Sequence, residues 1–331
     1  MQAFVHIVLV LIFFFSNITV DKSILSKLSE LNTIEKKDNE LMRVISYNTW
    51  GLPIPVAKSD QSFRFRLIPY ALNQTNADII CLQETFHPEL RNRILSRFNN
   101  YNFLSDHECD KRKLLFIKTD CHGGLMTLSK YPVLDESFHE FPISNRGNFI
   151  EDIGAKGVLI SKIEKGRDTV YILNTHLYAG ESSKAESIRL SQLKYINNLI
   201  QKLGDVNIIL AGDLNFENPE IYWNQDLKAQ LCYKYMIDQM GFIDSDFQFS
   251  EASCTINPKI NPYTKAQDRL KKLDYIMVLN SLGKVIQIED AKALAMKEWI
   301  YSDHLAWLTD IRLTSKIKPK SISMTRYTTE D

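Results

Sequence analysis

The chain has 331 residues, of which 44% are hydrophobic and 24% charged, as expected for a globular protein with one large domain or two small ones. Lysine and arginine together number 40, and so do aspartate and glutamate, so the formal net charge is zero. A protein that grips duplex DNA by its backbone normally carries a basic excess, and this balance therefore weighs against a nucleic-acid partner.

Residues 1–20 contain an apolar run, 3–15, that only His6 interrupts. The run is too short for a comfortable membrane span and has the length of an export signal, although no basic residue precedes it. We predict a signal peptide or an anchor over 1–20, with a buried segment as the alternative. The protein would then be secreted or exported, and membrane-anchored if the segment is not cleaved. The polar residues 21–40 are predicted to be a linker.

The chain has five cysteines and no pair with Cys-x-x-Cys spacing, so a zinc site is disfavoured. In an exported protein Cys109 and Cys121 could close a small loop, which the chain-entropy model values at up to about 3 kcal/mol. Free thiols in a reducing compartment are the alternative.

Two short apolar strands on the N-terminal side of the predicted domain end in polar residues. A strand over 41–46 leads to Asn48, and Gly51 then breaks regular structure. A second strand over 78–82 is followed by Glu84. Because α/β sheets usually place their chemistry at strand ends, both polar residues are candidates for a site.

Helices are predicted after both strands. Residues 63–71 carry apolar side chains at helical spacing, although Pro69 conflicts with one continuous helix. Pro88 is placed to open a second helix, with Leu90 and Ile94 on its buried stripe.

Three strands, over 123–128, 157–163 and 169–173, are predicted to follow one another without a long helix between them. The third ends in Asn174 and His176. This succession favours mixed pairing over a purely parallel sheet.

A long helix is predicted to begin near Ser182 and to stop at Gly204. Residues 208–216 then read Ile-Ile-Leu-Ala-Gly-Asp-Leu-Asn-Phe, an apolar strand that delivers Asp213 and Asn215 at its carboxyl end.

The last two predicted strands also carry polar residues at an end. Asp274 lies in a penultimate strand over 273–277, and Asp303 and His304 immediately precede a final strand over 305–311.

Strands that alternate with helices, including one expected over 227–240, indicate the α/β class. We predict one domain over 41–313. The basic residues 314–331 lack an apolar pattern and are predicted to be a disordered tail.

The polar residues at the strand ends are mainly carboxylates and carboxamides, joined by two histidines. Oxygen donors without thiolates favour a hard cation such as Mg²⁺ over zinc. A carboxylate can orient an imidazole as a base, so the set suits metal-assisted hydrolysis of a phosphate ester. Its members are Asn48, Glu84, Asn174, His176, Asp213, Asn215, Asp274, Asp303 and His304.

In this order the motifs resemble those of the endonuclease/exonuclease/phosphatase superfamily, which implies a four-layered α/β/β/α sandwich with two mixed β-sheets, as in deoxyribonuclease I. Three of them are most similar to the neutral sphingomyelinases, which are magnesium-dependent phosphodiesterases. They are Asn-Thr-Trp-Gly-Leu-Pro at 48–53, Asn-Thr-His-Leu at 174–177 and Ser-Asp-His-Leu-Ala at 302–306.

The resemblance implies a metal site and a base. Glu84 would bind the catalytic Mg²⁺, or Mn²⁺ as an alternative, with Asn48 beside it. His304, oriented by Asp303, would take a proton from the attacking water.

The resemblance implies substrate contacts for the remaining residues. Asp213 and Asn215 would position the water and stabilise the pentacoordinate phosphorus. Asn174 and His176 would hydrogen-bond the phosphate oxygens, and Asp274 would support the His176 side. Such placement suits phosphoryl transfer, which needs charge neutralisation and in-line geometry.

The implied reaction is hydrolysis of sphingomyelin to ceramide and phosphocholine at a membrane surface, with neither nucleic acid nor an obligate protein as a partner. The alternatives are a metal-dependent endonuclease or an inositol-phosphate phosphatase on the same fold, and a catalytically inactive binding protein. Lys156 is expected to be a surface lysine and Trp50 a packing residue. Near His304, the apolar residues that could reach a membrane are 299–301.

Overall fold

The computed structural model describes residues 34–35, 40–52, 60–103, 113–114, 117–118, 122–145, 147, 154–218, 231–247, 250–295 and 300–315. The expected signal segment 1–20, most of the linker 21–40, the Cys109 and Cys121 pair and the basic residues from 316 onward lie outside these ranges.

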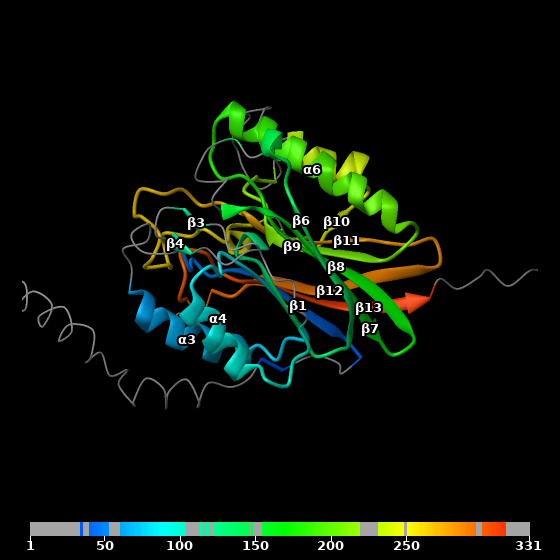
Figure 1. Ribbon diagram of the computed structural model, residues 1–331, viewed down its shortest axis with the longest axis horizontal. Helices are drawn as coiled ribbons and strands as arrows, with labels where there is room; N and C mark the ends of the chain where they lie inside the picture. Colours follow the sequence, from blue (N-terminus) through cyan, green and yellow to red (C-terminus); the bar gives the residue numbers. More distant parts are fainter. Residues whose placement is uncertain are drawn as a thin grey trace, which may run out of the picture.

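Two mixed β-sheets pack face to face, and helices cover the outer face of each (Figure 1). One sheet has the order β12 (Lys284–Ala293), β13 (Trp307–Ser315), β1 (Met42–Asn48), β2 (Ile79–Gln83) and β5 (Met126–Ser129). The other has the order β10 (Ile243–Asp244), β11 (Asp274–Leu279), β9 (Ile208–Asp213), β8 (Asp168–His176), β7 (Gly157–Lys165) and β6 (Val133–Glu140). A separate hairpin pairs β3 (Lys113–Leu114) with β4 (Ile117–Lys118).

The helical layers belong to different sheets. Helices α3 (Gln61–Gln74) and α4 (Pro88–Arg97) lie on the β1 side, and α6 (Ser183–Leu203) lies on the β9 side (Figure 1). Helix α7 (Leu231–Lys234) packs against α6 and continues as a π-turn over Tyr235–Gln239. Short 3-10 turns occupy His122–Gly124, Ile143–Asn145 and Glu251–Ser253. The predicted four-layered sandwich is confirmed.

Three apolar clusters correspond to the three interfaces between the four layers. One joins α3 and α4 to the first sheet, one joins α6 and α7 to the second sheet, and one lies between the sheets. Side chains alternate along β1, so that Val44 enters the core between the sheets whereas Ile45 and Tyr47 face the helices. Both faces of the central strands are therefore buried, which explains their continuous apolar sequences.

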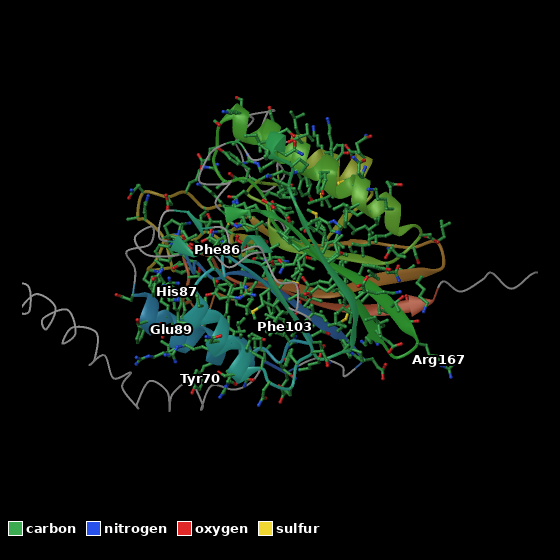
Figure 2. The ribbon with its side chains drawn as sticks, in the orientation of Figure 1. Tyr70, Phe86, His87, Glu89, Phe103 and Arg167 are labelled. Carbon is green, nitrogen blue, oxygen red and sulfur yellow. The ribbon has the colours of Figure 1, made fainter. Side chains whose placement is uncertain are left out.

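The start of α4 is capped by the residue that precedes Pro88. Figure 2 shows His87 and Glu89 at this end of α4; the Glu89 amide donates to Nδ1 of His87 at 3.3 Å, and Pro88 occupies the first turn. His87 therefore has a structural role.

Several predicted boundaries need correction. Helix α3 runs through Pro69, because Leu67, Ile68 and Leu72 bury its inner face and outweigh the lost hydrogen bond. Strands β6 and β12 were not predicted. Both contain many charged residues, because each is an edge strand of its sheet. The strand holding Asp274 is therefore not the penultimate one.

The domain is slightly longer than the predicted range 41–313. Strand β13 pairs with β12 up to Ser315, so the first two residues of the expected tail belong to the sheet. At the other end, Ile34 donates its amide to the Gln74 carbonyl at 2.9 Å, which docks part of the linker on α3. Within the described ranges, no helix is long and apolar enough to cross a bilayer.

Candidate active site

The candidate residues converge because their strands alternate in the same phase. Val44 of β1 and Ala211 of β9 face the core between the sheets, and Asn48 and Asp213 keep that direction at the carboxyl ends of their strands. The same alternation directs four further side chains to this interface. They are Gln83, Asn174, His176 and Asp274.

Asn48 and Asp213 join the two sheets directly. Nδ2 of Asn48 donates to Oδ2 of Asp213 at 3.0 Å, and Oδ1 of Asn48 accepts from the Trp50 amide at 3.0 Å. Asn48 is 1% exposed and Asp213 is 2% exposed, so this contact is shielded from water. The carboxamide oxygen is thus directed at the loop that follows β1.

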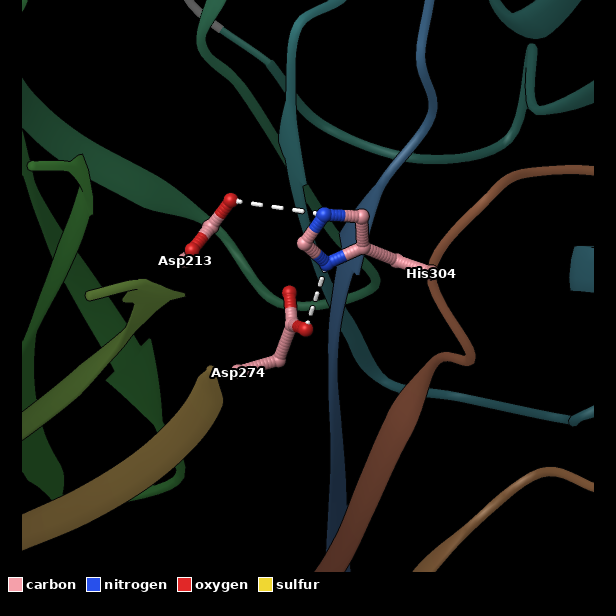
Figure 3. Close-up of side chains that lie close together, drawn as sticks. All are labelled: Asp213, Asp274 and His304. Atoms are coloured by element: carbon pink, nitrogen blue, oxygen red, sulfur yellow. Dashed lines mark hydrogen bonds and ion pairs between the residues drawn. The ribbon is translucent and has the colours of Figure 1, made fainter. Parts of the chain in front are cut away.

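His304 lies between two carboxylates (Figure 3). Its Nδ1 donates to Oδ2 of Asp274 at 2.7 Å, and its Nε2 is 3.7 Å from Oδ2 of Asp213. Burial alone lowers the pKa of His304, but the Asp274 and Asp213 carboxylates outweigh that effect and hold the pKa well above its usual value.

The structure corrects the residue expected to orient His304. Asp274 makes the hydrogen bond to the imidazole, although it had been assigned to the His176 side of the site. Strand pairing explains this position, because Asp274 on β11 lies opposite Asp213 on β9. Asp303 instead accepts from the Ser302 hydroxyl at 3.2 Å.

Asp303 interacts electrostatically with Glu84. Burial raises the pKa of Glu84 to about 7, and the Asp303 carboxylate is the next largest cause. Oε2 of Glu84 is buried and has no hydrogen-bond partner among the described residues. A buried carboxylate oxygen without a donor is costly unless a cation or a proton occupies the site.

Lys156 is a functional candidate that the sequence prediction placed wrongly on the surface. The side chain is buried, with the residue 7% exposed, and Nζ lies 3.1 Å from Nε2 of His176 and 2.9 Å from the Leu177 carbonyl. Its position just before Gly157, at the start of β7, was the available signal.

The contact with Lys156 determines the state of His176. An ammonium group can only donate, so Nε2 of His176 accepts and the proton lies on Nδ1. Burial, followed by the Lys156 charge, lowers the pKa of His176 to about 3. His176 is therefore neutral, and its Nε2 is 3.4 Å from Oδ2 of Asp213. His176 keeps one donor, the N–H of Nδ1, which is buried and has no hydrogen-bond partner among the described residues.

Asn174 does not belong to the site surface. Its Nδ2 donates to the carbonyls of Leu82 and Met126 at 3.1 and 3.0 Å, and its Oδ1 accepts from Gln83 at 2.8 Å. Because the carboxamide is fully used in joining the two sheets, the expected contact with phosphate is wrong.

Asn215 lies next to the His176 segment. Its amide donates to Oδ1 of Asp213 at 3.1 Å, and its Nδ2 donates to the Leu177 carbonyl at 3.2 Å. The Leu177 carbonyl also accepts from Lys156, so the two polar side chains share one acceptor.

Strained backbone gathers around these residues. Five non-glycine residues among those described have positive φ, and four of them are in or next to the site: Trp50, Glu84, Ala155 and Asn215. Such conformations cost about 1–3 kcal/mol each and tend to persist where function requires them. Ala155 directly precedes Lys156.

Two of the three apolar residues near His304 are buried. Ile300 is 3% exposed and Tyr301 is 8% exposed, whereas Trp299 lies outside the described ranges. These two residues belong to the protein interior.

A family model described as the Endonuclease/Exonuclease/phosphatase family matches residues 45–304. The chain belongs to this family. The match includes every candidate residue from Asn48 to His304 and confirms the resemblance stated from the motifs.

Three relatives of this family member have names that refer to sphingolipid or phospholipid cleavage. A Drosophila melanogaster protein provisionally named a neutral sphingomyelinase is 26% identical over 298 residues, covering 85% of this chain and 62% of the fly protein. Inositol phosphosphingolipids phospholipase C of Schizosaccharomyces pombe is 26% identical over 323 residues, covering 86% and 71%. Sphingomyelinase C of Bacillus cereus is 26% identical over 213 residues, covering 59% and 63%. The chain thus spans less than two thirds of the fly protein's length.

Solved structures share the fold. The crystal structure of SmcL aligns with a TM-score of 0.61 at 22% identity, covering 82% of this chain and 98% of SmcL. Danio rerio TDP2 in complex with a single-stranded DNA product gives 0.63 at 15% identity, covering 83% and 100%. A Staphylococcus aureus beta toxin variant with bound magnesium ions gives 0.60 at 20% identity, covering 81% and 99%.

Proposed function

We propose that this chain is a divalent-metal-dependent phosphoric diester hydrolase that cleaves sphingomyelin to ceramide and phosphocholine. The observation that carries the proposal is the buried His304 between Asp274 and Asp213, on the same edge of the sheets as Glu84. Family membership and the names of the relatives support the reaction class and a lipid substrate.

The residues at the Glu84 side fit a hard cation. Glu84 has a buried oxygen without a partner, and Asn48 provides a carboxamide oxygen at the end of the neighbouring parallel strand. We assign Mg²⁺ to these two residues, with Mn²⁺ as the alternative. When bound, such a cation neutralises phosphate charge and polarises the phosphoryl oxygen.

A second group could hold a cation by distance alone, because ligand atoms of Asp213, Asp274 and His304 all lie within 4.8 Å of one another. We assign this group to proton transfer. A histidine ligates a metal through a nitrogen lone pair, whereas Nδ1 of His304 carries the proton that it donates to Asp274, and its Nε2 lone pair is the one that the attacking water needs.

His304 acts as the general base in this proposal. With its Nδ1 proton held by Asp274, the neutral imidazole presents the Nε2 lone pair to water. Water oxygen bonds to phosphorus, its proton moves to Nε2, and the bond from phosphorus to the ceramide oxygen breaks. Asp213, 3.7 Å from Nε2 of His304, then passes this proton from Nε2 to the leaving alkoxide.

The other polar groups bind the phosphate. Lys156 contributes a buried positive charge beside His176, and Asn215 contributes a carboxamide on the same side. Both can stabilise the additional charge on the equatorial oxygens in the transition state.

Magnesium affinity should depend on pH because the proton and the metal compete for Glu84. The pKa of this carboxyl is raised to about 7, so it is largely ionised at pH 8 and largely protonated at pH 6. A metal requires the ionised form, and we expect the apparent affinity to fall by up to about tenfold for each pH unit below 7. Calorimetric Mg²⁺ titrations at pH 8, 7 and 6 measure this change. Equal affinity at all three would contradict Glu84 as the ligand.

The substrate is tested with a panel of head groups at saturating Mg²⁺. We expect phosphocholine release from sphingomyelin vesicles, much less from phosphatidylcholine vesicles, and no nicking of supercoiled plasmid. The S. pombe relative's name favours one second candidate, an inositol-bearing phosphosphingolipid. Faster release from that lipid would replace sphingomyelin as the substrate, and a folded, metal-loaded protein inactive on every phosphodiester would contradict the hydrolase.

We also propose that the protein is exported or anchored through residues 1–20, on the basis of their apolar run. Mass spectrometry of the N-terminus of protein from the natural source tests this. An intact N-terminus on protein found in the cytosol would contradict it.

A further inference from the structure

A buried arginine links the two loops that carry the proposed metal site and base. Arg64 lies on α3 and is 0% exposed. Its Nη1 donates to the carbonyls of Thr49 and Tyr301 at 3.0 and 2.9 Å, and its Nη2 donates to the Trp50 carbonyl at 2.8 Å. One guanidinium group therefore joins the loop after β1 to the loop before β13.

The first of these loops supports both proposed metal ligands. Trp50 donates its amide to Oδ1 of Asn48, and the Gly51 amide donates to the Glu84 carbonyl at 2.9 Å. Trp50 in this loop has positive φ, and so has Glu84 after β2, to which the loop is bonded, so both residues must be held against the preference of the backbone. Arg64 stabilises this loop by a cation–π contact as well, because its guanidinium lies 4.7 Å from the centre of the Trp50 ring.

The second loop leads directly to the proposed base. Tyr301 is followed by Ser302, whose hydroxyl accepts from the His304 amide at 3.3 Å. The carbonyl of Ser302 accepts from Nδ2 of Asn261 at 3.0 Å, so this loop is held from two sides. The carbonyl of Tyr301 is the point at which Arg64 fixes it to α3.

A packing role alone does not explain a charge at this position. Burying a guanidinium group is expensive, and an apolar side chain of similar volume is often as stable. The planar fork is suited to several carbonyls at fixed angles, which the single ammonium of a lysine cannot reproduce. In Arg64 this planar guanidinium joins carbonyls of the two loops at fixed angles.

We propose that Arg64 is a positioning residue that sets the Asn48 and Glu84 side of the site relative to His304, and so determines both Mg²⁺ affinity and the turnover rate. The first part of this inference rests on the metal site assigned in the proposed function, and only the second part rests on the proposed reaction. The first part concerns Mg²⁺ binding and is measured without any substrate.

Arg43 provides a matched control at the opposite end of β1. It is 1% exposed, forms a two-point ion pair with Asp310 at 2.7 Å and donates to the carbonyls of Ile34 and Thr75 at 2.6 and 2.9 Å. It is thus a buried arginine that serves several carbonyls, as Arg64 does, but it touches neither site loop.

The experiment compares Arg64→Lys with Arg43→Lys by calorimetric titration with MgCl₂ at pH 8 and by thermal unfolding. Replacing a group that supports metal ligands typically weakens metal binding by about 10–100-fold, and we expect this for Arg64→Lys. For Arg43→Lys we expect Mg²⁺ affinity within about twofold of wild type, at a similar or larger loss of Tm. Equal Mg²⁺ affinity in the two variants would overturn the inference.

A second variant and a second measurement guard against misfolding. Arg64→Gln removes the charge and leaves no buried ammonium without acceptors. Hydrogen exchange with and without Mg²⁺ should show slowing at 49–51 and at 301–304 together in wild type, and at 49–51 only in Arg64→Gln. Slowing at 49–51 alone in wild type would overturn the inference.

Activity separates this inference from the proposed function. For the Arg64 variants we expect a lower kcat on sphingomyelin even at saturating Mg²⁺, with KM little changed. If wild type binds Mg²⁺ but cleaves no phosphodiester, the proposed function fails and the Mg²⁺ comparison still decides the role of Arg64. If wild type binds no Mg²⁺, both fail.

Discussion

Replacing His304 with glutamine is expected to lower kcat by about 10²–10⁴-fold while KM and Mg²⁺ affinity stay close to wild type, because a positioned general base contributes that much to turnover. Glutamine keeps a polar side chain of similar length but cannot take the proton of the attacking water. Steady-state kinetics on sphingomyelin vesicles at saturating Mg²⁺, together with a calorimetric Mg²⁺ titration, measure the two quantities. A variant with at least half the wild-type kcat would exclude His304 as the base.

The two neighbouring carboxylates give the matched comparison for this prediction. Asp274 bonds Nδ1 of His304 and is the largest of the charges that raise its pKa, whereas Asp303 contributes less. A base works when deprotonated, so activity rises with pH through its pKa. Asp274→Asn lowers that pKa and should move the acid limb of the kcat profile to lower pH while reducing kcat. Asp303→Asn should move it less; the reverse order would restore Asp303 as the orienting residue.

The exchange of roles between Asp303 and Asp274 shows what the sequence could not provide. Asp303 is adjacent to His304 in the chain, and adjacency suggested the pairing. The actual partner comes from a different strand, because antiparallel β11 places Asp274 opposite Asp213. Residues that are neighbours in a loop can point to opposite sides, and strand register is not written in a local motif.

The sequence did predict which face of each strand carries the site residues, because side chains alternate along a strand. Once Asp213 and Asn48 are placed at strand ends, the period of two puts both on the face shared by the sheets. The same rule also directs Asn174 inward, two residues before His176, and there the prediction went too far. How deep a residue lies between the sheets depends on the stagger of β8 against β2. At the observed stagger, the Asn174 carboxamide hydrogen-bonds to Gln83 and to the Leu82 carbonyl of β2.

The fold was predictable where strands are buried on both faces and unclear where they are at an edge. The run 208–213 is wholly apolar up to its glycine, and its strand was recognised with its polar end. The need for glycine at position 212 came only from the structure, since a Cβ there would lie 2.1 Å from the Thr175 carbonyl of the adjacent strand. Strands β6 and β12 were not predicted, because strands at the edge of a sheet tolerate charged residues on both faces.

Replacing Glu84 with glutamine is expected to raise the stability of the metal-free protein at pH 8 while weakening Mg²⁺ binding by about 100-fold. The folded protein holds the Glu84 proton more tightly than the unfolded chain, since its pKa rises from 4.5 to about 7. Ionisation therefore costs folding free energy progressively between these two pH values, and the full cost is present above 7. At about 1.4 kcal/mol per pKa unit the cost is on the order of 3 kcal/mol, which glutamine avoids.

The sign of this effect separates a metal ligand from an ordinary buried carboxylate. Saturating Mg²⁺ at about 100 times its Kd should return about 2.7 kcal/mol to wild type and almost nothing to Glu84→Gln, so the variant's advantage should disappear when the metal is added. Glu186 is the control, because it is 6% exposed but accepts from Arg189 at 2.9 Å and from the Cys232 amide at 3.0 Å. Glu186→Gln should lower stability with or without Mg²⁺ and leave Mg²⁺ affinity unchanged. Thermal unfolding of both variants at pH 8 with EDTA or MgCl₂ measures the difference, and a Glu84→Gln protein less stable than wild type in EDTA would mean that this carboxylate is already satisfied without a cation.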